Sequence, residues 1–332
     1  MNTIFYNANL IINNQLLKNA SFTLNNNNQI LILDNVNQSQ KNKHNLNGAV
    51  VMPALSNMFV NVNKNFNEVI NACISNGVTN CVFNGVLNND DLKLANKTLG
   101  VFGVIINVNK LDEITNVSLL NEYNKILPYG FPIIYIYNIL NLTEFEIEKI
   151  YLFAKNNNAN LMVLANENLE QVGICHSETK QTPIELIESY GLFDLKLTLL
   201  KCQSVDKYDL EILKKYNANV VLTPIKDLLL GDGITPVVSL LDSGLNLSLA
   251  SLNYADNFLN VLRIVKLMQN GYLNNKNAVL TSDLIKMATN NNLFKNNGFI
   301  AIENNGDLDL DKFIVAENKK VRMVFVNGKQ IL

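Results

Sequence analysis

The sequence predicts an α/β protein: a (β/α)₈ TIM barrel joined to a small β-sandwich domain that the two ends of the chain form together. From residue 49, short apolar runs alternate with segments of helical periodicity, a pattern typical of parallel βαβ units. There are eight such runs, the number that closes a barrel of about 250 residues. A doubly wound open sheet is the competing architecture, but it seldom needs eight consecutive units.

The first 48 residues predict short antiparallel strands ahead of the barrel. Residues 3–13 and 19–35 alternate apolar and polar side chains and contain asparagine-rich turn signals. Residues 36–48 are polar and predict a loop.

The barrel strands and helices follow in alternation. We place strands at about residues 49–53, 78–83, 101–107, 132–138, 160–165, 196–201, 219–223 and 246–251. Among the helices between them, we place five at about residues 65–76, 144–155, 183–190, 206–216 and 235–243. The clearest signals are a capping box that begins at Thr143, Pro183 in a first turn, and Gly77 and Gly244 just past helix ends.

Short β segments return near the C-terminus. We expect strands at residues 298–302, 312–315 and 321–326, the last followed by an Asn327-Gly328 turn. Terminal β segments that flank a barrel can pair with each other. The predicted domains are therefore residues 49–302 for the barrel, and residues 1–48 with 303–332 for the β-sandwich.

Composition argues against several classes of function. The formal net charge is −2 and only two residues are arginine, so no positive field points to nucleic acid or an anionic membrane. The apolar runs are strand-length, too short to span a bilayer. The four cysteines form no CxxC pair that would suggest a disulfide framework or a zinc knuckle. With neither a basic N-terminal region nor a cleavage site, we expect a cytoplasmic protein.

Short motifs follow the predicted strands. In order they are VMPALSNMFVN at 51–61, MVLANE at 162–167, LLKC at 199–202, LTP at 222–224, LGDGITPV at 230–237, LASLN at 249–253 and VFVNGK at 324–329. Each motif alone is weak. Their order, and the place of most of them after a predicted strand, make the combination more specific.

In this order the motifs resemble the amidohydrolase superfamily, in the branch of chlorohydrolases and of deaminases of nucleobases and adenosine derivatives. The resemblance covers nearly the whole chain. It implies a barrel hydrolase that cleaves C–N bonds, in which zinc or iron, bound by three histidines and an aspartate, activates a water molecule. In such barrels the active site lies at the C-terminal ends of the strands.

The residues at the implied metal-binding positions depart from the family. Its Pro-Gly-Leu-x-Asn-x-His-x-His pattern places Phe59 and Asn61 at two histidines, and its His-x-x-Glu pattern places Leu164 at a third. Lys201 stands at the histidine of an Ala-His-Cys motif, and Leu252 at the aspartate of Leu-Gly-Thr-Asp-Gly. Phe and Leu have no lone pair, Lys repels a cation, and an Asn carbonyl is a poor ligand for these metals. We therefore expect no metal cofactor.

Glu167 stands at the position of the family's proton-shuttling acid, and Glu167 and Lys201 are the candidate catalytic residues. Both should project from adjacent strand ends. A buried carboxylate left unpaired costs several kcal/mol, so we expect the two head groups to lie within about 6 Å of each other. The Lys201 ammonium would then partly replace the lost metal charge.

Other polar residues are weaker candidates. Asp232 and Asp256 lie in loops that shape the family's substrate mouth, and Asn253 follows Leu252 at the last strand end. We expect the two histidines, His44 and His176, to be solvated, so no shifted histidine cluster can rebuild the metal site.

Three functions stay open. The first is a pseudoenzyme whose pocket binds a small molecule or nothing. The second is a metal-free enzyme in which Lys201 acts with Glu167 as a base or imine-forming nucleophile; the apolar Phe59, Leu164 and Leu252 would depress its pKa, and ionised Glu167 would oppose that. The third is a scaffold or partner subunit, since family members commonly dimerise, and we expect a homodimer.

Overall fold

The computed structural model describes most of the chain in two sheets with helices packed around the larger one. The described residues are 3–12, 15–24, 30–33, 43–110, 114–253, 257–289, 298–304, 308–317 and 319–332. Within them, no helix combines the length and the apolar character that crossing a membrane requires.

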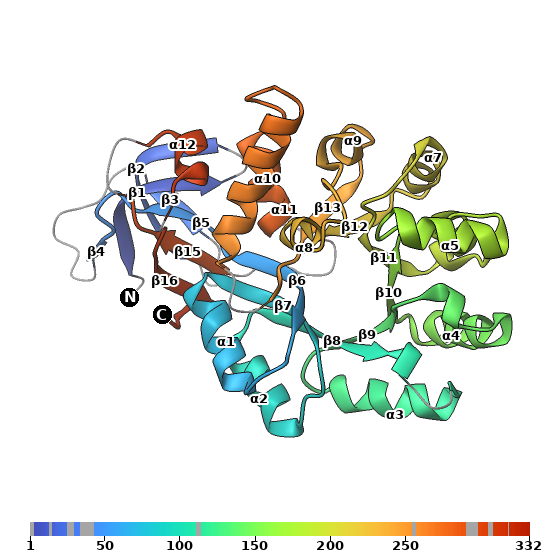
Figure 1. Ribbon diagram of the computed structural model, residues 1–332. Helices are drawn as coiled ribbons and strands as arrows, with labels where there is room; N and C mark the ends of the chain where they lie inside the picture. The colour runs from blue at the N-terminus through green and yellow to red at the C-terminus, as the bar shows by residue number, and fades with distance from the viewer. Residues whose placement is uncertain are drawn as a thin grey trace.

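The larger sheet is a parallel barrel that follows the order of the chain, which confirms the predicted fold class (Figure 1). Its strands are β6 (Leu55–Asn61), β7 (Val78–Asn84), β8 (Val101–Asn107), β9 (Phe131–Ile136), β10 (Asn160–Ala165), β11 (Lys196–Lys201), β12 (Asn219–Leu222) and β13 (Asn246–Leu249). The short β14 (Leu252–Asn253) pairs in parallel with β6, so the last segment of the sheet returns to the first.

Helices lie between successive strands. They are α1 (Phe66–Ser75), α2 (Asn89–Thr98), α3 (Asn116–Ile126), α4 (Glu144–Asn157), α5 (Leu169–Thr179), α6 (Pro183–Ser189), α7 (Lys207–Lys215), α8 (Pro224–Leu230), α9 (Val237–Asp242), α10 (Phe258–Tyr272) and α11 (Thr281–Thr289), with 3₁₀ turns η1 (Val108–Lys110), η2 (Ile139–Asn141) and η3 (Leu192–Asp194). The capping box at Thr143 and Pro183 in a first turn are confirmed. Gly77 follows the cap of α1 with a φ of 77°.

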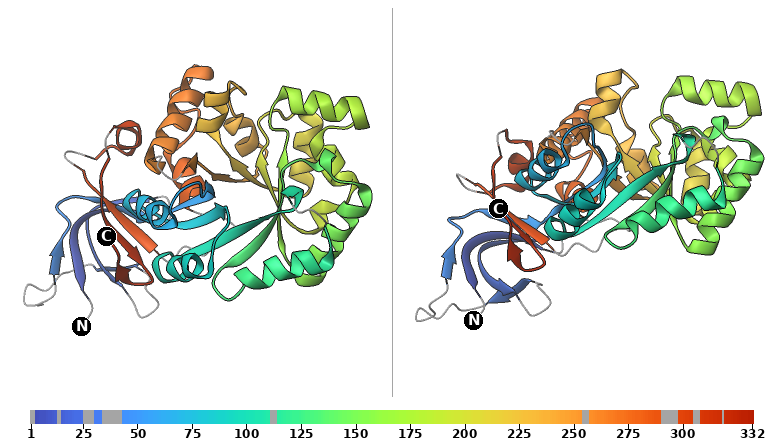
Figure 2. Two further views of the ribbon diagram at one scale, coloured as in Figure 1. Left: turned by 60° about the horizontal axis from the view of Figure 1, so that its bottom comes forward. Right: turned by 90° about the horizontal axis from the view of Figure 1, so that it is seen from below.

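A second sheet joins strands from the N-terminal and C-terminal segments of the chain at one side of the barrel (Figure 2). It comprises β1 (Ile4–Ile12), β2 (Gln15–Leu24), β3 (Ile30–Leu33), β4 (Lys43–Asn45), β5 (Val50–Pro53), β15 (Gly298–Ile302), β16 (Val321–Val326) and β17 (Lys329–Gln330). Phe5, Phe22, Phe299 and Phe325 pack together at its core. The strands form a single hydrogen-bonded sheet, whereas the predicted sandwich would have two.

Two strand predictions are wrong. Residues 50–53 pair with β1 and β15 in the small sheet, so the first barrel strand is β6, which begins six residues after the predicted start at residue 49. Pro53 marks the change of sheet, and the predicted strand ended there without a second strand being placed directly after it. Residues 312–315 belong to helix α12 (Leu310–Val315), which Asp309 caps by accepting hydrogen bonds from two backbone N–H groups.

Apolar side chains inside the barrel separate its two ends. Met58, Val82, Ile105, Met162 and Val221 form a buried plug across the interior. Above the plug, at the C-terminal ends of the strands, lies the candidate site.

Candidate functional site

A cavity of about 580 Å³ opens at the C-terminal ends of the barrel strands. Its walls are Phe59, Asn61, Asn84, Asn107, Asn109, Lys110, Tyr135, Tyr137, Asn141, Leu164, Glu167, Leu200, Lys201, Lys226, Leu230 and Leu252. A smaller cavity, of about 170 Å³, lies toward the opposite ends of β12 and β13. We place the site at the larger one, because barrel enzymes build their sites at the C-terminal face.

All five positions that the family would use for metal ligands line this mouth. Phe59 and Leu164 are almost fully buried and form part of its apolar floor. Asn61 has both ends of its amide engaged: Nδ2 donates to the Leu252 carbonyl at 3.1 Å, and Oδ1 accepts from Asn84 at 2.8 Å. The fifth position is Lys201.

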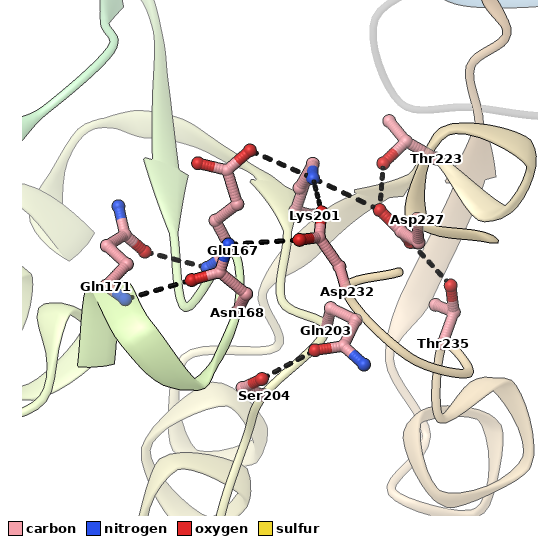
Figure 3. Close-up of polar contacts among 10 residues, drawn as sticks. All are labelled: Glu167, Asn168, Gln171, Lys201, Gln203, Ser204, Thr223, Asp227, Asp232 and Thr235. Carbon is pink, nitrogen blue, oxygen red and sulfur yellow. Dashed lines mark hydrogen bonds and ion pairs between the residues drawn. The ribbon is translucent and has the colours of Figure 1, made fainter. Parts of the chain in front are cut away.

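The Lys201 ammonium lies among three carboxylates (Figure 3). Its Nζ is 2.9 Å from Glu167 Oε1, 2.8 Å from Asp232 Oδ2 and 3.3 Å from Asp227 Oδ1. The predicted pairing with Glu167 is therefore confirmed. An ammonium has three N–H donors, so one lysine can serve all three acids.

Local backbone geometry presents these groups to one another. Lys201 itself has a φ of 77°, a left-handed conformation that costs a non-glycine residue about 1–2 kcal/mol. Gly231 ends α8 with a φ of 72°, and Gly233 has a φ of 113°, where a Cβ would lie 2.5 Å from Gln203. The two glycines therefore let the loop turn and bring Asp232 back to Lys201.

Asp227 is the acid that the sequence analysis missed. It lies in α8 with no exposed surface, and accepts hydrogen bonds from Thr223 Oγ1 at 2.9 Å and Thr235 Oγ1 at 2.6 Å. A signal was present: Asp227 lies three residues after the LTP motif at 222–224, which is one of the motifs that carry the family resemblance.

The electrostatics keep Lys201 charged. Burial lowers its pKa, but the hydrogen bonds to Asp232 and Glu167, with the charges of Asp227 and Glu167, outweigh burial, and the pKa is raised. The depressed pKa considered for a metal-free enzyme is therefore wrong, because three acids face the ammonium. Burial raises the pKa of Asp227, whereas Lys201 and Asn168 lower that of Asp232 in spite of burial.

Glu167 keeps one carboxylate oxygen available to the cavity. Its Oε1 contacts Lys201, while its Oε2 has no hydrogen-bond partner among the described residues, and the side chain is 22% exposed. Its backbone N–H donates to Gln171 Oε1 at 2.7 Å, which fixes the loop after β10. Nearby, burial and the neighbouring Tyr137 and Glu167 raise the pKa of Tyr135, so its phenol stays protonated.

Of the other polar residues considered from the sequence, the structure places Asp232 in the site but not Asn253 or His176. Asp232 is drawn into the site through Lys201 and through Asn168 Nδ2, which donates to its Oδ1 at 3.1 Å. Asn253 is exposed in β14 and does not line the mouth cavity. Asp256 lies outside the described residues, and His176 is exposed on α5.

The residues present do not fit the metal that the family implies. Phe59, Leu164 and Leu252 offer no donor atom. The three acids nearest to the site already surround an ammonium, which would repel a divalent ion. Within the described ranges, His, Cys, Asp and Glu form no group of three that could hold a metal ion.

Sequence reasoning also missed most of an arc of amides on the wall that β6, β7, β8, η1 and η2 form. Five asparagines line it, of which the sequence analysis named only the first: Asn61, Asn84, Asn107, Asn109 and Asn141. Asparagine is so frequent in this chain that no single one stands out by type.

Comparisons with known proteins agree with the barrel fold and with the resemblance of the sequence motifs to the amidohydrolase superfamily. Residues 69–331 match the profile described as "Amidohydrolase family". A stretch of 149 residues is 29% identical to a 5-methylthioadenosine/S-adenosylhomocysteine deaminase from Caldicellulosiruptor saccharolyticus, over 44% of this chain and 35% of that protein. The match thus spans about a third of that relative's length.

Solved structures share the fold over the whole chain. A guanine deaminase from C. acetobutylicum with bound guanine superposes with a TM-score of 0.79, at 16% identity and over 100% of both chains. An atrazine chlorohydrolase from Arthrobacter aurescens, complexed with zinc, gives a TM-score of 0.81 at 14% identity, over 99% of this chain and 95% of that one. At these identities the likeness shows the fold alone.

Proposed function

This chain belongs to the amidohydrolase family, and we propose that it binds a small molecule in its barrel mouth without performing metal-dependent deamination. One observation supports the proposal: Lys201, at a metal-ligand position, is held as an ammonium by three carboxylates. Its charge occupies the place where the family needs a coordinating lone pair.

The cavity supports a binding role. A volume of about 580 Å³ suits a small organic molecule. The floor is apolar at Phe59, Leu164 and Leu200, and the walls carry amides, a free carboxylate oxygen at Glu167 and a neutral phenol at Tyr135. Polar groups that converge over an apolar floor fix the orientation of a ligand.

Imine chemistry at Lys201 is less favourable. An amine attacks a carbonyl through its lone pair, which a raised pKa keeps protonated at neutral pH. Three acceptors also hold the Nζ hydrogens in place. Lys201 therefore serves better as a fixed positive charge that orders Glu167, Asp227 and Asp232.

Ammonia release is the direct test of the missing reaction. The substrates to assay are guanine, 5′-methylthioadenosine and S-adenosylhomocysteine, with zinc, iron or manganese added, next to a Glu167→Gln variant. We expect no turnover above the heat-denatured protein. Activity of about 10⁴ M⁻¹s⁻¹ or more that E167Q abolishes would overturn the proposal.

A ligand-binding screen is the second test of the proposed function. A small-molecule library screened by thermal shift should yield compounds that raise the melting temperature. Their effect should disappear in a variant that fills the mouth, such as Leu200→Trp. Absence of any compound with this behaviour would contradict a binding role.

A further inference from the structure

The free hydrogen-bond donors of the amide wall point to the chemistry of the ligand. Resting on the proposed binding role, we propose that the mouth takes a small anionic organic molecule, whose carboxylate or phosphate binds between Asn107, Lys110 and Asn141. All three line the cavity on the side of β8 and η2.

Asn107 presents its NH₂ group because its oxygen is already engaged. The Oδ1 atom accepts a hydrogen bond from the Asn109 backbone N–H at 3.2 Å. A backbone N–H can only donate, so this contact fixes which end of the Asn107 amide is oxygen. Its Nδ2 has no partner in the part of the chain that the structure describes, and Asn107 lines the cavity.

Asn141 is oriented by a similar chain of contacts. The Leu140 backbone N–H donates to Asn138 Oδ1 at 3.1 Å, so Asn138 must offer its Nδ2. That Nδ2 donates to Asn141 Oδ1 at 3.3 Å, which leaves the Asn141 NH₂ as a second unengaged donor. Asn109 braces the same turn, since its Oδ1 accepts from the Tyr137 N–H at 2.6 Å.

Lys110 adds a full positive charge beside these two donors. It ends η1, three residues after Asn107, and no described carboxylate forms an ion pair with its Nζ. Two amide NH₂ groups and an ammonium that line one wall match the acceptor oxygens of a carboxylate or phosphate. A cationic head group is less favourable there, because Lys110 would repel it and the side-chain oxygens of Asn107 and Asn141 each already accept a hydrogen bond.

The other wall would orient such a ligand. There Glu167, Asp227 and Asp232 surround the Lys201 ammonium, and the charge of Lys226 helps to lower the pKa of Asp232. Three acids against two cations repel an anion. The anionic head is therefore directed to the Lys110 side, and the body of the ligand lies over the floor.

Matched pairs of compounds test whether the mouth prefers an anionic ligand. Indole-3-acetate is compared with indole-3-acetamide, and 1-naphthyl phosphate with 1-naphthol, by competition NMR at low ionic strength. Each pair keeps the apolar body and changes the charge. We expect at least one anion to bind about tenfold more tightly than its neutral partner, as one charge-assisted contact provides. Which pair responds distinguishes a carboxylate from a phosphate.

Two variants test whether the preference for the anion depends on Lys110 and Asn107. Lys110→Gln removes the charge, and Asn107→Asp keeps the acceptor for the Asn109 N–H while it replaces the donor with a repelling oxygen. Both should abolish the preference for the anion. Lys97→Gln, the same charge change at an exposed site on α2, should leave it unchanged.

Several outcomes would overturn the inference. They are equal binding of both members in both pairs, no binding by any of the four compounds, or an anion preference that survives in both K110Q and N107D. If one of these outcomes occurs but the library screen finds neutral ligands in the mouth, only the anion preference is contradicted and the proposed binding role is kept. If the library screen also finds no ligand, both the anion preference and the binding role are contradicted.

Discussion

At the scale of single residues, the site depends on one lysine that several acids share. Lys201 is 4% exposed, and Asp227 has no exposed side-chain surface. Burying charges is unfavourable unless each has a partner, and removing one partner leaves the others uncompensated. The lysine is therefore structurally required wherever the three acids are ionised.

Lys201→Met should destabilise the protein by about 3–5 kcal/mol near neutral pH. The loss should be smaller in acid, because Asp227, whose pKa is raised, takes up a proton early as the pH falls and then needs no counter-charge. Urea unfolding at two pH values measures both effects.

Lys215→Met is the matched control for that measurement. Lys215 forms an exposed ion pair with Glu188 at 2.8 Å, and such pairs contribute less than about 1 kcal/mol. Equal losses in the two variants would show that Lys201 is not the common partner of the buried acids.

At the scale of elements, a buried side-chain amide reinforces the backbone pairing of β14 with β6 at the seam of the barrel. Asn57 of β6 is buried, its Nδ2 donates to Ser251 Oγ at 2.7 Å, and the Ser251 N–H donates to its Oδ1 at 3.1 Å. Ser251 lies between β13 and β14, so this amide joins the first and last strands of the barrel.

Asn57→Ala should cost about 2–3 kcal/mol, since it leaves a buried backbone N–H without its acceptor and opens a small void. Chemical denaturation measures the loss. Asn67→Ala, at an exposed position of α1, should change stability by no more than about 0.5 kcal/mol. A loss at Asn57 as small as that would contradict its role at the seam.

Helix α12 is capped by a buried lysine. Lys319 Nζ donates to the carbonyls of Ile314 and Ala316, and burial, together with the charge of Arg263, lowers its pKa to about 8. Between this value and the ordinary 10.5, only the unfolded chain holds the proton. The contribution of Lys319 to stability therefore rises with pH across that window.

Lys319→Met abolishes this pH dependence. The free energy of unfolding of the variant, relative to that of the unmodified protein, should fall by about 2 kcal/mol between about pH 7 and pH 9.5. The reason is that the unmodified protein becomes more stable over this range, because Lys319 loses its proton and no longer buries a charge. Guanidinium unfolding at both pH values tests the difference. No change with pH would mean that Lys319 titrates normally in the folded state.

Some elements of the fold could be predicted from the sequence, and others could not. Barrel strands such as β10 and β11 were predictable because each is a short apolar run that ends at polar or glycine residues. The change of sheet at Pro53 was harder to predict, since β5 and β6 are both buried strands separated by a single residue, and the pairing partners of each lie far away in the sequence. Asp309, which starts α12, is a local capping signal that the predicted strand at 312–315 ignored.

Some residues of the candidate site could likewise be predicted from the sequence, and others could not. Adjacent strand ends brought Glu167 and Lys201 together, so register alone predicted that pair. Asp227 reaches the site through a helix, and its place depends on packing that no period in the sequence records. The donor ends of Asn107 and Asn141 depend on which neighbouring backbone groups they meet, which only coordinates show.

At the scale of the whole molecule, the chain has the fold of its family, and the five mouth positions that the sequence resemblance assigns to metal ligands hold Phe59, Asn61, Leu164, Lys201 and Leu252. The barrel and the second sheet depend on apolar packing outside the mouth, so the fold does not require metal ligands at these positions. The cation among the acids of the mouth is the Lys201 ammonium. A homodimer stays a prediction for this molecule.

The metal content of the purified protein tests the central claim most directly. The protein should be prepared without chelators, dialysed against zinc, iron or manganese, and analysed by elemental mass spectrometry with Lys201→Met beside it. We predict less than about 0.1 metal ion per chain for the unmodified protein, because the Lys201 ammonium repels a divalent cation. One tightly held ion per chain, lost on substitution of Glu167, would contradict this reading of the site.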